Sequence, residues 1–247
     1  MPSSSAKRTS STNPRILLAL LLLAIGAFAV ALSAGSVSVD WAGVMEGLRG
    51  RDLSVDYAVV FQLRLPRAAT AFVVGGMLGL AGVLMQILLR NPLADPYVLG
   101  VSGGAAVAAL LAILLGWHMA GISGAAAVGA LASMFLVFVL SRGRGDWSTT
   151  RLLLTGVVLA AGWGAVVSFI LAVSPDAHVR GMLFWLMGDI RETFPGWIRL
   201  GILMTSLLVA FGFARSLNLL SLGELRAESL GVNTTLLRAG LFFMAGL

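Results

Sequence analysis

Long runs without a formal charge alternate with short polar stretches along this chain. A helix of about 20 apolar residues is long enough to cross the hydrocarbon core of a bilayer. The pattern therefore predicts an all-α polytopic membrane protein, with a polar tail at 1–15 and a transmembrane domain at 16–247. Six complete spans are expected, at about 16–34, 68–89, 97–116, 121–140, 152–173 and 199–214, with an incomplete seventh at 236–247.

The span at 68–89 carries small residues and a single amide along one helical face. Gly75, Gly79, Gly82 and Gln86 are spaced so that they share that face. Small residues let membrane helices approach closely, and an amide can donate a hydrogen bond across such a contact. The pattern predicts that this helix lies at the centre of a bundle, with its small-residue face packed against neighbouring helices.

Prolines follow this span at two nearby positions. They form the dipeptides Asn91-Pro92 and Asp95-Pro96. Because proline lacks an N–H and disfavours helix at the residue before it, these dipeptides predict an extended turn. The next span then begins with the glycine-rich sequence VLGVSGGA.

Composition supports a membrane protein and excludes several other classes. Of the 247 residues, 58% are hydrophobic and 11% are charged, whereas soluble domains carry about 25% charge. The chain has no cysteine, which excludes disulfides and thiolate metal sites. The net charge of +6 is spread over short loops rather than clustered, so we expect no nucleic-acid partner.

The distribution of positive charge predicts the orientation. With alternating spans, ten Lys and Arg residues lie on the side of the N-terminus and seven on the other side. Positive residues prefer cytoplasmic loops, so we expect a cytoplasmic N-terminus in a multi-pass plasma-membrane protein. An alternative for the first span is a cleavable signal peptide, because Ala31-Leu32-Ser33 could form its cleavage site.

The chain shows no sequence signature of catalysis, of a cofactor or of a metal site. The interiors of the spans lack ionisable residues, which disfavours a self-powered secondary transporter. The Walker A, HExxH and GxSxG patterns are absent, which disfavours a polytopic membrane enzyme. His118 lies in a turn with no second ligand nearby. Energy for uphill transport would have to come from a partner.

The polar loop at 216–234 contains the sequence SLGELRAESLGV. Glu224 and Glu228 are four residues apart and share a helical face, and Gly231 can end such a helix. Ala227 and Leu230 offer apolar contact. The segment predicts either a docking helix for a partner or an ordinary solvated loop helix.

Three stretches of the chain together resemble the FecCD-type permeases of ABC importers for iron chelates, haem and vitamin B12. They are RLPR, GxxxGLAGxxxQ and RNPLADPxxLGVSGGA. The resemblance implies a type II, vitamin B12-importer-like bundle that has ten spans in the family. It also implies a second permease protomer in a homodimer or heterodimer, a cytoplasmic ABC ATPase subunit and an external solute-binding protein. Iron(III)-siderophore, haem or cobalamin would be the cargo. Because the family has more spans, we expect this chain to be a fragment or a truncated gene product.

The resemblance also implies roles for particular residues. The pattern LGE-xx-A-xx-LG matches a loop that docks into the ATPase, with Gly223, Glu224, Ala227, Glu228, Leu230 and Gly231 as its members. Thr149 and Thr150 match a hydroxylic pair that narrows the pathway between protomers. As an alternative, Ser148 or Thr149 is simply a helix N-cap.

Two further matches lie on the expected outer side. Arg64 and Arg67 bracket Pro66, which predicts a proline-fixed turn whose guanidinium groups can bind carboxylates. In the resembling family they meet glutamates of the solute-binding protein; the alternative is contact with lipid headgroups. The sequence FWLMGDI resembles an external helix beside the substrate portal, and Trp185 and Trp197 could instead anchor it at the membrane interface.

Overall fold

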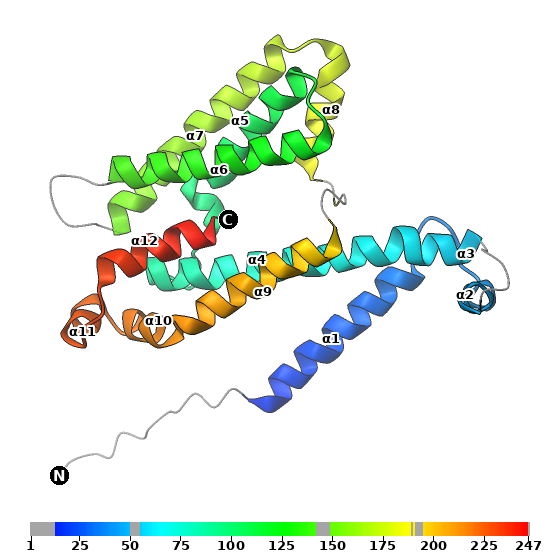
Figure 1. Cartoon of the computed structure of the whole chain (residues 1–247). Coiled ribbons are helices and arrows are strands. Elements are labelled where there is room, and N and C mark those ends of the chain that lie inside the picture. Colours follow the sequence, from blue (N-terminus) through cyan, green and yellow to red (C-terminus); the bar gives the residue numbers. More distant parts are fainter. Residues whose placement is uncertain (1–12, 50–54, 142–148, 189, 191–194, 247) are drawn as a thin grey trace. The chain divides into compact units, whose positions relative to one another are not determined.

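The computed structural model describes residues 13–49, 55–141, 149–188, 190 and 195–246, and every regular element in them is a helix (Figure 1). This confirms the predicted all-α class. Contacts divide the chain into two units, residues 1–69 and residues 70–247. Each unit is described by itself.

The first unit begins with α1 (Pro14–Ser33), an apolar helix of 20 residues. The side chain of Asn13 accepts a hydrogen bond from the Arg15 N–H and caps its start. The short helix α2 (Trp41–Leu48) follows in the same unit. Asp40 caps it by accepting from the Ala42 N–H at 3.0 Å.

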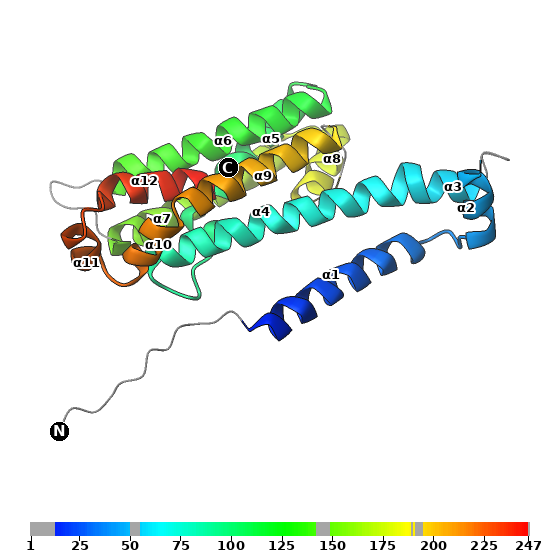
Figure 2. The ribbon, with the colours of Figure 1, turned by 60° about the horizontal axis from the view of Figure 1, so that its bottom comes forward.

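The turn predicted around Pro66 is wrong. The π-helical segment η1 (Val59–Arg64) joins α3 (Val55–Ala58) to α4 (Leu65–Leu89), so residues 55–89 form one helix (Figure 2). Pro66 is the second residue of α4. A proline inside an α-helix removes one i→i−4 hydrogen bond. The preceding π-helix already has a different hydrogen-bond register, so the helix continues past the proline.

The turn predicted after α4 is present. Arg90 follows the helix with a φ of 48°, and the Asn91 side chain accepts a hydrogen bond from the Leu93 N–H. Asp95 then caps a 3₁₀ helix, η2 (Pro96–Leu99), by accepting from the Tyr97 N–H at 2.7 Å. Asn91 and Asp95 thus each accept a hydrogen bond from a nearby backbone N–H. Such local bonds compete with those of a helix and favour a turn.

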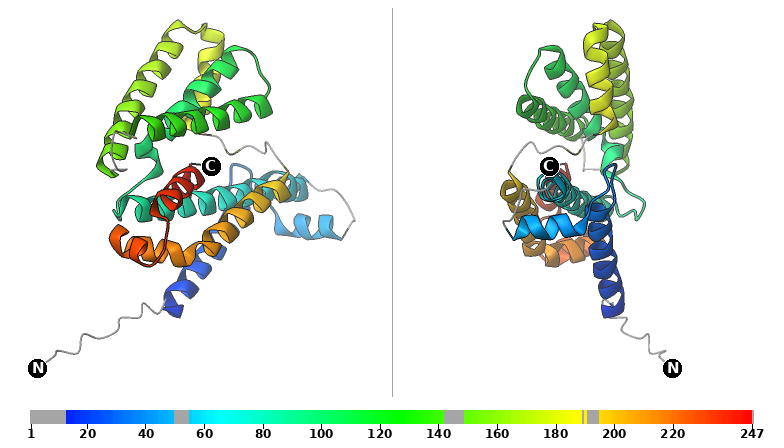
Figure 3. Two further views of the ribbon diagram at one scale, coloured as in Figure 1. Left: turned by 60° about the vertical axis from the view of Figure 1, so that its left-hand side comes forward. Right: turned by 90° about the vertical axis from the view of Figure 1, so that its right-hand side faces the viewer.

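Four helices pack together next: α5 (Val101–Leu114), α6 (Met119–Ser141), α7 (Thr149–Val173) and α8 (Asp176–Met187) (Figure 3, green and yellow). Where α5 crosses α6, a Cβ added to Gly104 would lie 2.5 Å from the Gly129 carbonyl oxygen. The Ser133 hydroxyl donates to the Gly100 carbonyl and accepts from Trp163 Nε1, both at 2.8 Å. Glycine contacts and one buried hydroxyl therefore hold α5, α6 and α7 together.

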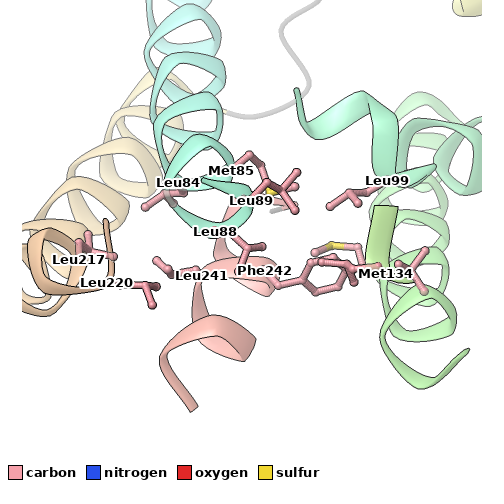
Figure 4. Close-up of a cluster of buried hydrophobic side chains, with 13 residues drawn as sticks. Leu84, Met85, Leu88, Leu89, Leu99, Met134, Leu217, Leu220, Leu241 and Phe242 are labelled. Carbon is pink, nitrogen blue, oxygen red and sulfur yellow. The ribbon is translucent and has the colours of Figure 1, made fainter. Parts of the chain in front are cut away.

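The chain then forms α9 (Gly196–Gly212), α10 (Ala214–Ser221), α11 (Glu224–Ser229) and α12 (Thr234–Ala245), with a bend of 61° between α9 and α10. Their packing centres on one apolar cluster (Figure 4). It joins the end of α4 to α6, α10 and α12, and its buried members are Leu84, Met85, Leu88, Leu89, Leu99, Met134, Val137, Leu152, Leu217, Leu220, Leu241, Phe242 and Ala245.

The helices differ from the expected spans mainly in length. In the described part of the chain, four are long and apolar enough to cross a membrane, or five if the bent α9–α10 pair counts as one span. The expected span at 97–116 contains α5, which has 14 residues because Gly100 and Gly116, each with a φ of 71°, flank it. At 1.5 Å per residue, α5 is about 21 Å long, short of the bilayer core of about 30 Å. The count of six complete spans stays a prediction.

The small-residue face of α4 does not make the close contacts expected of it within the described residues. A Cβ added to Gly75, Gly79 or Gly82 would meet no atom within 4 Å, and Gln86 is exposed. The helix instead buries its larger apolar side chains, such as Leu84, in the cluster of Figure 4. Leucine and methionine bury more apolar area than glycine, which explains the choice of face. A partner for the glycine face remains a prediction.

Candidate functional site

The predicted docking helix is present as α11, between α10 and α12. Gly223 and Gly231 flank it with φ values of 129° and 82°, which favour glycine. At its end, the Val232 N–H donates to the Ala227 carbonyl at 3.0 Å, and the Gly231 N–H donates to the Glu228 carbonyl at 2.9 Å. This pair of bonds is a Schellman motif, so Gly231 ends the helix as predicted.

One side of α11 is buried and the other is apolar but exposed. Ala227 is fully buried, and its N–H donates to the Gly223 carbonyl at 3.0 Å. Leu225 and Leu230 are 83% and 65% exposed. Large apolar side chains exposed on a polar loop are often contacts for another protein. The exposed leucines therefore make this loop a candidate contact for another subunit.

The two glutamates of α11 contact α12 instead of standing clear of the chain. Glu224 Oε1 lies 2.5 Å from Arg238 Nη1, and its Oε2 lies 3.9 Å from Arg90 Nη2. Glu228 Oε1 accepts a hydrogen bond from Thr234 Oγ1 at 2.6 Å. The helical face that Glu224 and Glu228 share thus contacts α12 of the same chain.

Sequence reasoning missed the role of Arg238. It counted this residue only as a positive charge of the loop, but Arg238 lies in α12 and is buried, with 6% of its surface exposed. A signal was available, because Arg238 is the lone charge in the apolar stretch LLRAGLFF. A single charged residue in such a stretch is usually paired and functional.

Thr149 and Thr150, the predicted gate residues, are the first two residues of α7. Thr150 is exposed, and Leu152, in the same first turn, is buried in the cluster of Figure 4. The alternative N-cap residue Ser148 lies outside the described residues. The gate role of the two threonines stays a prediction.

Arg64, the first predicted docking arginine, is engaged within its own unit. Its Nη1 donates to the carbonyls of Leu32 and Ser33 at 2.9 Å each, and its Nη2 donates to the Val37 carbonyl. A Cβ on Gly35 would lie 2.7 Å from Nη2, so a side chain there would displace the guanidinium. Arg64 therefore satisfies carbonyls at the end of α1, a role that suits a cation at a helix C-terminus.

Arg67, the second docking arginine, is exposed. The two arginines thus differ in their surroundings, although the sequence treats them as a pair. Docking of a binding protein by Arg64 and Arg67 stays a prediction.

The expected portal helix corresponds to α8, although Asp189 of its FWLMGDI sequence lies outside the described residues. A cavity of about 790 Å³ separates parts of α5, α6 and α8, with Phe184 and Trp185 in its lining. Trp185 is half-buried and packs against α5 and α6, whereas Trp197 is 75% exposed. Only Trp197 has the exposure expected of an interfacial anchor.

Comparisons with known proteins agree with this architecture. The model of the FecCD transport family matches residues 20–247. The chain is 34% identical to the molybdate import system permease protein MolB of Haemophilus influenzae, over 94% of this chain and 72% of that protein. It is 42% identical to the ferric enterobactin permease FepD of Escherichia coli K12, over 86% of this chain and 65% of the relative.

Two further comparisons extend the same result. The vitamin B12 import permease BtuC of Escherichia coli is 32% identical over 92% of this chain and 68% of its own length. A solved structure of an inward-facing transporter, assigned to the metal-chelate type of ABC transporter, superimposes with a TM-score of 0.76 at 32% identity. It covers 94% of this chain and 72% of that one. The chain therefore spans between 65% and 72% of the length of these proteins, and it belongs to the FecCD transport family of ABC importer permeases.

Proposed function

We propose that this chain is the membrane permease subunit of an ABC importer and that α11 is the helix through which a cytoplasmic ATPase drives it. The observation that carries the proposal is the exposure of Leu225 in α11 and of Leu230 directly after it, in a short polar loop that buries Ala227. The FecCD relatives, which are permease proteins of import systems, support the same function. ATP hydrolysis then belongs to the partner subunit.

The packing around α11 supports transmission of motion into the membrane domain. The flanking helices α10 and α12 bury Leu217, Leu220 and Phe242 in one cluster with Leu88 of α4 (Figure 4). Closely packed interiors move as units rather than deform continuously. A push on α11 by the ATPase would therefore shift α10 and α12 together with the end of α4.

The remaining parts of the proposal follow from the family. The chain works in the inner or plasma membrane as one of two permease protomers, with its N-terminus in the cytoplasm. Thr149 and Thr150 form the cytoplasmic gate at the start of α7, and Arg64 and Arg67 contribute to docking of the external binding protein. The expected six complete crossings belong to the same proposal.

For the cargo we propose an iron(III)-siderophore. The support is the 42% identity to the ferric enterobactin permease, compared with 34% and 32% for the molybdate and vitamin B12 permeases. Because these relatives carry chemically different cargoes, family membership alone does not select among them. Uptake by proteoliposomes that contain the assembled transporter should be measured with labelled ferric siderophore, haem, cobalamin and molybdate. Uptake of molybdate or cobalamin alone would overturn this assignment.

The docking proposal is tested with a charge placed on the exposed side of α11. Leu225→Arg should abolish co-purification of the ATPase, because a desolvated unpaired charge is costly in an apolar contact. The matched control is Leu236→Arg in α12, where the leucine is 70% exposed but lies outside α11. Unchanged ATPase binding by Leu225→Arg would refute docking at α11. Uptake that needs only an ion gradient would favour a secondary transporter.

A further inference from the structure

Arg238 differs from the other charged residues that the structure describes because it is almost completely buried. Its side chain is 7% exposed, and its Nε has no hydrogen-bond partner. Helix α12 surrounds it with buried residues, Thr234 one turn before it and Leu241 and Phe242 one turn after it. Burying a cation without a counter-ion is costly, so the contact with Glu224 at 2.5 Å has to compensate it.

The partner of this arginine lies on a helix that cannot set its own direction. Helix α11 has only six residues, and isolated helices shorter than about 12 residues are marginal in water. Its two flanking glycines, Gly223 and Gly231, allow many backbone directions. The orientation of α11 must therefore come from contacts that its side chains make with neighbouring elements.

We propose that Arg238 and Glu224 are positioning residues that orient α11 for its partner. Their ion pair fixes the first turn of α11 to the middle of α12, while the Glu228–Thr234 hydrogen bond fixes its last turn to the start of α12. With both ends attached on one side, Leu225 is left on the other, where it is 83% exposed. The benefit for transport rests on the proposed function of α11 as the ATPase contact.

Arg90 adds a third element to the same carboxylate. It directly follows α4, has a φ of 48°, and its Nη2 lies 3.9 Å from Glu224 Oε2. The Glu224 side chain is 37% exposed and the Arg90 side chain 38%, so this contact is weaker than the shorter one with Arg238, whose side chain is 7% exposed. Glu224 nevertheless contacts both Arg90, which follows α4, and Arg238 of α12, so a displacement of α11 would change both contacts.

The orientation can be measured directly because the chain has no cysteine. Nitroxide labels are attached to Leu225→Cys on α11 and Val158→Cys on α7, two positions that are 83% and 70% exposed. The chain is placed in lipid nanodiscs, and the distance distribution between the labels is measured by double electron–electron resonance. With Glu224 and Arg238 unchanged, the two labels should give one narrow distance distribution.

The decisive variant combines Glu224→Gln with Arg238→Met. Replacing one member of a buried ion pair leaves the other uncompensated, whereas replacing both with uncharged groups is often neutral for folding. The double variant should therefore keep its helical content and insertion but give a distance distribution at least about twice as wide, since a six-residue helix is marginal without tertiary contacts. The control Arg226→Gln changes an exposed charge on the same helix and should leave the width unchanged. An unchanged width in the double variant would show that the pair serves folding only and would overturn the inference.

A functional measurement separates this inference from the proposed function. In the assembled transporter, loaded binding protein should stimulate ATP hydrolysis about fivefold less in the double variant than in the wild type, within the usual range of coupling energies. If the wild-type chain fails to bind any ATPase, the proposed function fails, but the distance measurement still decides the role of Arg238. If the wild type couples and the double variant couples equally well, only the positioning role is wrong.

A more conservative substitution covers the case in which the double variant does not insert. Glu224→Asp keeps the charge but withdraws it by one methylene group, so it should widen the distance distribution without loss of the fold. A narrow distribution with the native glutamate and a wide one with aspartate would support positioning. A narrow distribution with aspartate would refute the need for the 2.5 Å contact.

Discussion

The crossing of α5 and α6 predicts a sharp response to the smallest possible substitution. A Cβ added to Gly129 would lie 2.3 Å from the Gly104 carbonyl oxygen and 2.6 Å from the Ala108 Cβ. Non-bonded heavy atoms attract one another at about 3.5–4.0 Å, so both contacts would be strongly repulsive. The first contact is with backbone, which cannot rotate away, and the two helices would have to separate.

The magnitude of Gly129→Ala follows from two opposing effects. Overpacking of a closely packed contact costs about 1–3 kcal/mol. The better helix propensity of alanine returns up to about 1 kcal/mol. We expect the upper part of the overpacking range because a backbone atom is involved, which leaves a net destabilisation of about 1–2 kcal/mol. For a chain of this size, that lowers the melting temperature by about 2–8 °C.

The assay compares Gly129→Ala with Gly124→Ala in the same helix. A Cβ added to Gly124 would meet nothing within 4 Å, so this control should be neutral or slightly more stable. Tryptophan fluorescence follows thermal unfolding in detergent, at one heating rate because membrane proteins often unfold irreversibly. Equal melting temperatures for the two variants would refute the close approach of α5 and α6.

Four other predictions follow from single contacts. Ser133→Ala should destabilise the fold by about 1–3 kcal/mol because it leaves Trp163 Nε1 without its acceptor; equal thermal stability would contradict it. Ala227→Pro removes the N–H that donates to Gly223, so ATPase stimulation should be lost while membrane insertion stays normal; retained transport would place docking elsewhere. Arg64→Gln removes the guanidinium that binds carbonyls at the end of α1, so amide hydrogen exchange just after α1 should become faster. Loss of binding-protein affinity without faster exchange would indicate a docking role for Arg64 instead. A cysteine at position 230 should react with an impermeant maleimide only from the cytoplasmic side, and labelling from outside would reverse the topology.

Local features of the structure could be predicted from the sequence because short-range physics determines them. Uncharged apolar runs favour helix, since the backbone must satisfy its hydrogen bonds internally in a bilayer. Asp95 at the start of η2 and Gly231 after α11 lie at the helix boundaries where their side-chain or backbone preferences place them. The resemblance that identified the family rests on the same continuous stretches.

Tertiary structure decided which segments meet, and it changed the role of several residues. Glycines spaced along α4 and glycines on α5 and α6 look alike in sequence, but a Cβ on Gly75, Gly79 or Gly82 would meet nothing within 4 Å, whereas Gly104 and Gly129 lie against each other's helix. Arg64 resembles a free docking charge until the end of α1 and Val37 bring three carbonyls to it. Arg238 resembles a loop cation until the folding of α11 against α12 buries it beside Glu224. Spacing along one helix specifies a face, whereas the free energy of burying or pairing that face depends on residues far away in sequence, and only the folded chain brings those together.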